Sequence, residues 1–263
     1  MAILEICCTS METALTMLQA GAHRVELCSV LECGGLTPTW LSRLRDYPSL
    51  SRVSPGDTPR LFPGDMDSSV ANQPSPDTLN SNLLKCSHVL IRCRPGDFCY
   101  TQAEVDEMCQ SIRLCREIGV KGVVIGALTP DGDLDITALH KMIHVATGQS
   151  ETVESTDPKR ALTIVFHRAF DECRTPLRTM EQLIQLNFDS ILTSGQAPTA
   201  DQGIPLLKQL VVQAANRINI MAGRGVTVDN VARIIQETGV PAVHLSQRGG
   251  ISRILHQIQK ATP

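Results

Sequence analysis

The sequence lacks both an excess of positive charge and a long apolar run. Its 263 residues carry a formal net charge of −3, so the chain as a whole has no attraction for nucleic acid or anionic lipid. The longest apolar stretches, such as residues 122–128, are far shorter than the roughly 20 residues that cross a bilayer. Residues 3–6 read as a strand with no basic region before them, so we expect no signal peptide. These absences predict a soluble cytoplasmic protein that binds neither nucleic acid nor membrane.

Several kinds of catalytic motif are also missing. None of the six lysines follows a predicted strand, which disfavours Schiff-base chemistry at a strand end. No His, Asp and Glu residues have the close spacing of a zinc hydrolase motif. The ten cysteines include no zinc-ribbon CxxC pair, and a reducing compartment argues against a disulfide framework. Most of the cysteines are therefore expected to be buried apolar residues.

What the chain does have is an apolar strand followed by a helical pattern, repeated eight times. The strands are expected at residues 3–8, 23–29, 88–93, 122–127, 162–166, 190–193, 217–221 and 242–246. The first helix is expected to be capped near Thr9 or Ser10 and the second to begin near Pro38. Further helices are expected at residues 102–118, 135–146, 176–186, 205–216 and 228–237, and a short last helix to end near residue 259.

This alternation predicts a parallel sheet, because a parallel crossover needs a connecting helix. Eight units in a chain of this length favour an α/β fold of the TIM (β/α)8 barrel type, with an open doubly wound sheet as the alternative. A single domain would span residues 1–263. Residues 48–82 and 148–159 are rich in polar, Pro and Gly residues and are predicted to be disordered insertions. Both fall between a helix and the next strand, at the end of a barrel away from its site.

Polar side chains gather at the predicted strand ends. The fifth strand stops at His167 and Arg168, and Asp171 follows closely. Inward-facing residues alternate along a barrel strand. The mouth of the barrel would therefore collect Glu5, Glu26, Arg92, Arg94, His167 and His244. Buried charges need partners, so Glu–Arg pairing is expected whether or not a ligand binds.

The pattern Glu-x-Cys occurs on both of the first two strands and places Cys7 and Cys28 on inward faces. Adjacent strands lie about 4.8 Å apart, so two thiols at the same level could hold one soft ion such as Cu(I). The alternative is that both are inert buried thiols, which is the usual fate of a core cysteine. Cys33, in the loop after the second strand, is a candidate additional ligand.

Two glycine-containing loops follow the seventh and eighth strands and resemble an anion-binding cradle. Their glycines include Gly223, Gly225 and Gly249, and each loop carries an arginine. Barrels often bind phosphate in these two loops through backbone N–H groups. Glycines also serve ordinary tight turns, so that interpretation stays open.

The residues are similar to those of the copper homeostasis protein CutC family. The matching segments include Leu4-Glu5-Ile6-Cys7, Arg24-Val25-Glu26-Leu27-Cys28-Ser29, Ile91-Arg92-Cys93-Arg94-Pro95-Gly96-Asp97-Phe98 and Phe166-His167-Arg168-Ala169-Phe170-Asp171. The resemblance implies a TIM barrel, a location in cytoplasm and nucleus, self-association into a homo-oligomer and a Cu(I)-binding role. The cysteines implicated in that role match Cys7 and Cys28. The loop Ala222-Gly223-Arg224-Gly225 departs from the family's Pro-Gly-Gly-Gly, which weakens the predicted anion cradle.

Two functional hypotheses follow. The first is a Cu(I)-binding protein of copper homeostasis with Cys7 and Cys28 as metal ligands. The second is a barrel enzyme that acts on a small anionic metabolite held by Arg92, Arg94 and the glycine loops, with His167 as general acid or base and Glu26 or Asp171 as its partner. One mouth could hold both sets. A weaker third hypothesis is an interaction scaffold that uses residues 48–82.

Overall fold

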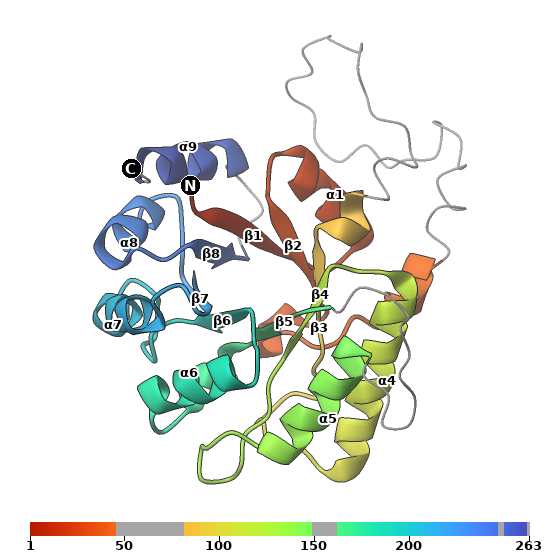
Figure 1. Ribbon diagram of the computed structural model, residues 1–263. Coiled ribbons are helices and arrows are strands. Elements are labelled where there is room, and N and C mark those ends of the chain that lie inside the picture. The colour runs from red at the N-terminus through yellow and green to blue at the C-terminus, as the bar shows by residue number, and fades with distance from the viewer. Residues whose placement is uncertain (46–81, 149–161, 247–249, 262–263) are drawn as a thin grey trace, which may run out of the picture.

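Eight parallel strands close into a barrel in the computed structural model, which describes residues 1–45, 82–148, 162–246 and 250–261. The strands pair in sequence order, and the last pairs with the first (Figure 1). They are β1 (Ile3–Cys8), β2 (Arg24–Leu27), β3 (Ser87–Leu90), β4 (Gly122–Ile125), β5 (Thr163–Phe166), β6 (Ser190–Thr193), β7 (Asn219–Gly223) and β8 (Ala242–Leu245). The predicted TIM barrel is confirmed.

Helices surround this barrel on the outside (Figure 1). They are α1 (Met11–Gln19), α4 (Gln102–Ile118), α5 (Ile136–Thr147), α6 (Pro176–Gln185), α7 (Ile204–Ala214), α8 (Val231–Thr238) and α9 (Ile251–Ala261). Polar caps fix where several of them begin: Thr101 and Glu104 form a reciprocal capping box at α4, and Ser10 accepts from the Thr13 N–H at α1.

The helix predicted to begin at Pro38 is wrong in type. The structure has a short 3₁₀ helix there, η2 (Leu41–Arg45). Its two buried residues, Leu41 and Leu44, lie three positions apart, and residues at that spacing share one face of a 3₁₀ helix. The predicted insertions at residues 48–82 and 148–159 fall almost wholly outside the described residues.

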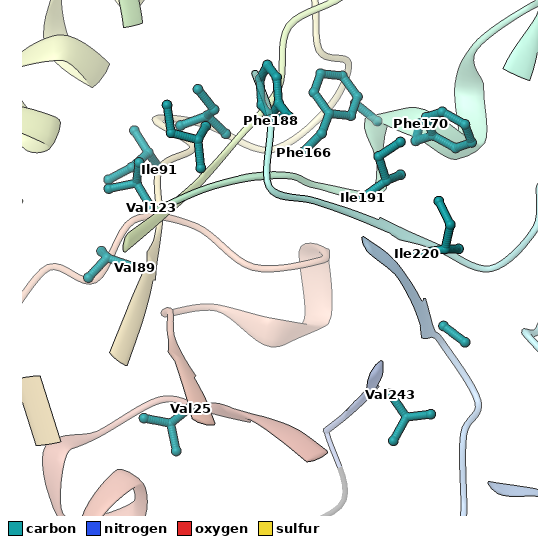
Figure 2. Close-up of a cluster of buried hydrophobic side chains, with 14 of the residues drawn as sticks. Val25, Val89, Ile91, Val123, Phe166, Phe170, Phe188, Ile191, Ile220 and Val243 are labelled. Carbon is teal, nitrogen blue, oxygen red and sulfur yellow. The ribbon is translucent and has the colours of Figure 1, made fainter. Parts of the chain in front are cut away.

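The alternation of side chains along the strands produces two separate hydrophobic clusters. The outer one packs strand residues such as Val25, Val89 and Val123 against the helices, and Figure 2 shows these side chains arranged around the barrel. The inner one fills the barrel with one residue from each strand or strand end: Cys7, Cys28, Leu90, Val124, Val165, Leu192, Met221 and Ala242. The inward positions of Cys7 and Cys28 therefore agree with the expected alternation.

Two further 3₁₀ segments lie at the carboxyl ends of the strands. η1 (Leu31–Cys33) follows β2, and η3 (Arg168–Glu172) follows β5. They form part of the rim of the barrel mouth. In TIM barrels, the loops at this end carry the residues that contact ligands.

Candidate functional site

The carboxyl ends of the strands open into a cavity of about 990 Å³. Side chains from opposite sides of the barrel line it, among them Cys7 and Glu26 on one side and His167 on the other. Arg92, Phe98, Asp171, Gly225 and His244 also contribute. A concave site at this end of the barrel is where such folds place their chemistry.

Two thiols meet at the floor of this cavity. The Sγ atoms of Cys7 and Cys28 lie 2.9 Å apart, and both residues are almost completely buried. The Cys28 thiol also points toward the carbonyl oxygen of Cys8, at 3.7 Å. The thiol contact with Cys28, burial and the nearby Glu26 carboxylate raise the pKa of Cys7 far above that of a free thiol. Both cysteines are free, so the pair can bind a metal only by giving up thiol protons.

Glu5 lies one layer deeper in the barrel than Cys7, on the same face of β1. Its carboxylate accepts from the guanidinium of Arg24, and its Oε1 lies 2.7 Å from His244 Nδ1. His88 Nδ1 is 3.4 Å from the other carboxylate oxygen. Burial opposes the charged form of Glu5, but Arg24, His244 and His88 together hold its pKa well below the usual range. Glu5 is therefore a buried anion that faces one guanidinium and two imidazoles.

His244 connects this deep layer to the mouth. Its Nδ1 faces Glu5, and its Nε2 lies 3.4 Å from Glu26 Oε2. Burial alone would lower the pKa of His244, yet the Glu26 and Glu5 carboxylates raise it above the ordinary value. Burial raises the pKa of Glu26. The Cys7 sulfur, a Glu26 oxygen and a His244 nitrogen all lie within 4.8 Å of one another, which is a group that could hold a metal ion.

His167 stands on the opposite side of the cavity, directly after β5. Its Nδ1 accepts from the Ala169 N–H at 3.1 Å, so the ring proton of the neutral form is on Nε2. Burial, with the positive charge of Arg92, lowers the pKa of His167 to about 3. A Cβ atom at residue 126 would lie 2.4 Å from the imidazole, so only glycine leaves room for this ring. His167 is therefore a neutral hydrogen-bond donor facing the cavity from a fixed position.

Arg92 approaches the same part of the cavity from the loop after β3. Its terminal nitrogens donate to the carbonyls of Cys33, Gly35 and Gly96, and its guanidinium lies over the Phe98 ring at 4.8 Å. The Phe98 ring also packs against His167, with 4.9 Å between ring centres. Arg92 Nε and His167 Nε2 are buried and have no hydrogen-bond partner among the described residues.

Arg94, the other arginine predicted for the mouth, takes a different position and is not among the described residues that line the cavity. Its guanidinium donates to Glu104 at 2.6 Å, to Asp97 at 3.0 Å and to the carbonyl of Cys99 at 2.7 Å. It also lies over the Tyr100 ring. Arg94 thus connects the loop after β3 to the start of α4.

Asp171 lines the cavity but uses its carboxylate within the protein. It accepts from the Ser194 N–H and hydroxyl, from the Thr193 hydroxyl and from the Gln196 N–H, and it pairs with Arg168 at 3.0 Å. The sequence suggested Asp171 or Glu26 as the partner of His167. In the structure, His167 Nδ1 accepts from the Ala169 N–H, and Nε2 has no hydrogen-bond partner among the described residues, so neither carboxylate bonds to this imidazole.

The two glycine loops are only partly described, since Gly249 lies outside the described residues. Gly225 lines the cavity with a left-handed backbone, φ +73°. Gly223 instead ends β7, where a Cβ atom would meet the Leu192 side chain at 2.5 Å. Gly223 therefore serves packing between β6 and β7, and Gly225 is the glycine at the rim.

A sequence model of the CutC family matches residues 2–46 and 74–249. The chain belongs to the CutC family. It is 37% identical over 246 residues to a CutC family protein of Pasteurella multocida, an alignment that covers 94% of this chain and 82% of that protein. A CutC family protein of Parabacteroides distasonis is 38% identical, with 94% and 83% of the two chains covered.

Solved structures agree with this assignment. A CutC protein from Streptococcus agalactiae, to which a role in copper homeostasis is provisionally assigned, superimposes with a TM-score of 0.70 at 29% identity, covering 94% of this chain and 100% of that one. A thiamine phosphate pyrophosphorylase from Pyrococcus furiosus, 12% identical with a TM-score of 0.56, covers 100% of this chain and 97% of its own and shares the fold alone. Within the described part of this CutC chain, no helix is long and apolar enough to cross a membrane.

Three residues that surround the predicted site residues were not predicted from the sequence: Arg24, His88 and Phe98. Glu5 pairs with Arg24 rather than with an arginine at the mouth, His88 completes its surroundings, and Phe98 stacks between Arg92 and His167. Arg24 could have been found, because it alternates with Glu26 on the same strand and so shares the inward face. The positions of His88 and Phe98 depend on strand register and loop path, for which the sequence offers no comparable signal.

Proposed function

We propose that this CutC protein binds Cu(I) through Cys7 and Cys28 and serves copper homeostasis, as the name of its S. agalactiae relative suggests. The observation that carries the proposal is the 2.9 Å separation of the two sulfurs. Soft thiolate ligands select Cu(I) over the harder divalent ions. Cys7 lines the cavity, whereas Cys28 is fully buried and is not among the described residues that line it, so an ion entering from the mouth meets Cys7 first.

Competition titration of Cu(I) into the reduced protein tests this. We expect Cys7→Ser and Cys28→Ser each to abolish tight binding, because one thiolate cannot replace two. Cys86→Ser is the matched control, since Cys86 precedes β3 at the opposite end of the barrel. Cys33→Ser tests the additional ligand at the rim. Unchanged stoichiometry and affinity in the Cys7→Ser/Cys28→Ser double variant would rule out this site.

A second candidate function rests on the two unpartnered donors, Arg92 Nε and His167 Nε2. Both residues line the cavity, and Gly225 lies at its rim, so together they suit a small carboxylate or phosphate. With its pKa near 3, His167 would stabilise an oxyanion by donating from Nε2 rather than act as a general base. The CutC chain would then be a barrel enzyme for an anionic metabolite.

Thermal-shift measurements with inorganic phosphate and small carboxylates test this second function. A stabilising hit should be lost in His167→Gln and in Arg92→Ala and kept in Arg94→Ala, because the Arg94 guanidinium is already occupied by the α4 loop. A shift that survives both of the first two substitutions would remove these donors from the proposal.

A further inference from the structure

We infer that Cys7, Glu26 and His244 form a divalent-metal site, suited to Zn²⁺, that overlaps the Cu(I) pair at Cys7 and opens onto the cavity. The inference goes beyond the proposed copper function and shares only Cys7 with it. Three observations carry it: the spacing of the three ligand atoms, the contact between His244 and Glu5 that fixes the imidazole, and the cavity onto which all three residues open.

The three ligand atoms have the spacing of a metal site. The Cys7 sulfur, a Glu26 oxygen and a His244 nitrogen lie within 4.8 Å of one another. Bonds of 2.0–2.3 Å in a tetrahedral zinc site put ligand atoms about 3.3–3.6 Å apart. The 3.4 Å between His244 Nε2 and Glu26 Oε2 falls in that range. The three residues sit on β1, β2 and β8, which are adjacent strands of the barrel.

His244 is held in the way a metal-binding imidazole is held. Its Nδ1 lies 2.7 Å from Glu5 Oε1, so Nδ1 carries the proton and Nε2 is left to face Glu26. Metal-ligating histidines commonly donate their other ring N–H to a carboxylate, which fixes the ring and raises its basicity. Glu5 is itself fixed by Arg24 and His88. Glu5 is therefore a positioning residue for the site.

The group leaves one side free. Cys7, Glu26 and His244 all line the cavity, whereas Cys28 is fully buried and does not line it. Three protein ligands and an open fourth position distinguish catalytic zinc sites from closed structural ones. The thiolate and carboxylate charges balance a divalent cation in these buried surroundings.

The donor set separates this site from the Cu(I) pair. Two thiolates suit a soft monovalent ion, and a mixed sulfur, oxygen and nitrogen set suits a borderline divalent one. Because both sites use Cys7, they exclude each other. Binding of Cu(I) should therefore depend on Cys28 and not on His244, and binding of the divalent ion should depend on His244 and Glu26 and not on Cys28.

The experiment is a pair of titrations of the reduced, metal-free full chain, one with Co²⁺ as a spectroscopic substitute for Zn²⁺ and one with Cu(I). We expect one Co²⁺ per chain, with thiolate-to-cobalt charge-transfer absorption that Zn²⁺ displaces. Cys28→Ser should keep this signal and lose Cu(I). His244→Gln and Glu26→Gln should lose it and keep Cu(I). His140→Gln, which alters an exposed imidazole on α5, should change neither.

Glu5→Gln tests the positioning role and should weaken Co²⁺ binding by about 10- to 100-fold and shift the visible cobalt bands. Thermal unfolding without metal shows whether each variant is folded. If His244→Gln is not folded, Glu26→Gln alone tests the loss of Co²⁺ binding. The inference is overturned if the unaltered chain binds no Co²⁺, if His244→Gln and Glu26→Gln bind it normally, or if Cys28→Ser loses it. Failure of the copper proposal shows separately, as Cu(I) binding that survives in Cys28→Ser.

Discussion

At the scale of single residues, the barrel interior is organised by one buried charge. Glu5 is completely enclosed, and its carboxylate accepts from Arg24 and faces two imidazoles. Removing one partner of a buried pair leaves an uncompensated charge, whereas an exposed pair contributes little. Arg24, which pairs with buried Glu5, and Arg217, which pairs with Glu181 at the surface, allow the two kinds of ion pair to be compared.

Arg24→Ala should destabilise the protein by about 3 kcal/mol, because Glu5 loses its cationic neighbour while remaining buried. Arg217→Ala is the control: it breaks the surface pair with Glu181, at 2.7 Å, and should cost less than about 1 kcal/mol. Urea unfolding of both variants at neutral pH measures the difference. Equal losses in the two variants would contradict the importance assigned to the Glu5 pair.

His167 predicts a pH dependence of stability. Its pKa falls from an ordinary 6.5 to about 3 in the folded chain, mainly through burial. Between those pH values the unfolded chain binds a proton that the native chain does not, so this group's contribution is full above pH 6.5 and is lost as pH falls toward 3. The loss at pH 4 should be about 3 kcal/mol.

The substitution His167→Gln should flatten this part of the pH profile, and His140→Gln, at an exposed position, should leave it unchanged. Free energies of unfolding from urea titrations at several pH values between 4 and 8 provide the measurement. A His167→Gln profile as steep as that of the unaltered chain would mean that His167 is not held neutral.

Residue-scale prediction from sequence succeeded where alternation along a strand was sufficient. The repeated Glu-x-Cys pattern placed Cys7 and Cys28 on inward faces, and the two sulfurs do meet. It failed for Arg94, because an arginine after a strand can turn to the adjacent helix as readily as into the barrel, and Glu104 at the start of α4 draws it outward. The roles assigned to the mouth residues remain predictions.

At the scale of elements, η3 is attached to the end of β6 through one carboxylate. Asp171 accepts from four donor groups of Thr193, Ser194 and Gln196, which belong to the end of β6 and the loop after it. This arrangement explains the Phe-His-Arg-Ala-Phe-Asp segment without chemistry at Asp171. The carboxylate holds the rim while His167, four residues earlier, faces the cavity.

Asp171→Ala should therefore destabilise the chain by about 2–3 kcal/mol, since several buried donors lose their acceptor together. Asp171→Asn keeps one acceptor oxygen and should cost less. Thermal unfolding compares the two, with Asp229→Ala at an exposed position of the loop before α8 as control. Normal stability combined with lost binding of a small anion would instead assign Asp171 to the ligand.

The order of elements was predictable because apolar strands and helical patterns alternate along most of the described chain; after β2 the structure has 3₁₀ segments where a helix was expected. The ends of the strands were harder to predict than their order. β3 was expected to reach Cys93, but pairing stops at Leu90 and the chain turns into the loop that carries Arg92. Strands at a barrel mouth diverge, and an apolar run does not reveal where its backbone stops pairing.

At the scale of the whole molecule, closure of the barrel creates the site. Pairing of β1 with β8 sets Glu5 opposite His244, two residues 239 positions apart in sequence. No local sequence pattern predicts the contact between Glu5 and His244. Only the prediction of a closed barrel implies that the first and last strands pair. Homo-oligomer formation and a location in cytoplasm and nucleus stay predictions of the family resemblance.

X-ray absorption spectroscopy of the reduced, Cu(I)-loaded chain tests the central claim most directly, because it identifies the atoms bound to the metal. The account predicts one copper per chain with two sulfur ligands, and loss of that signal in the Cys7→Ser/Cys28→Ser double variant. Copper bound only by nitrogen or oxygen, or the same sulfur signal in the double variant, would contradict it.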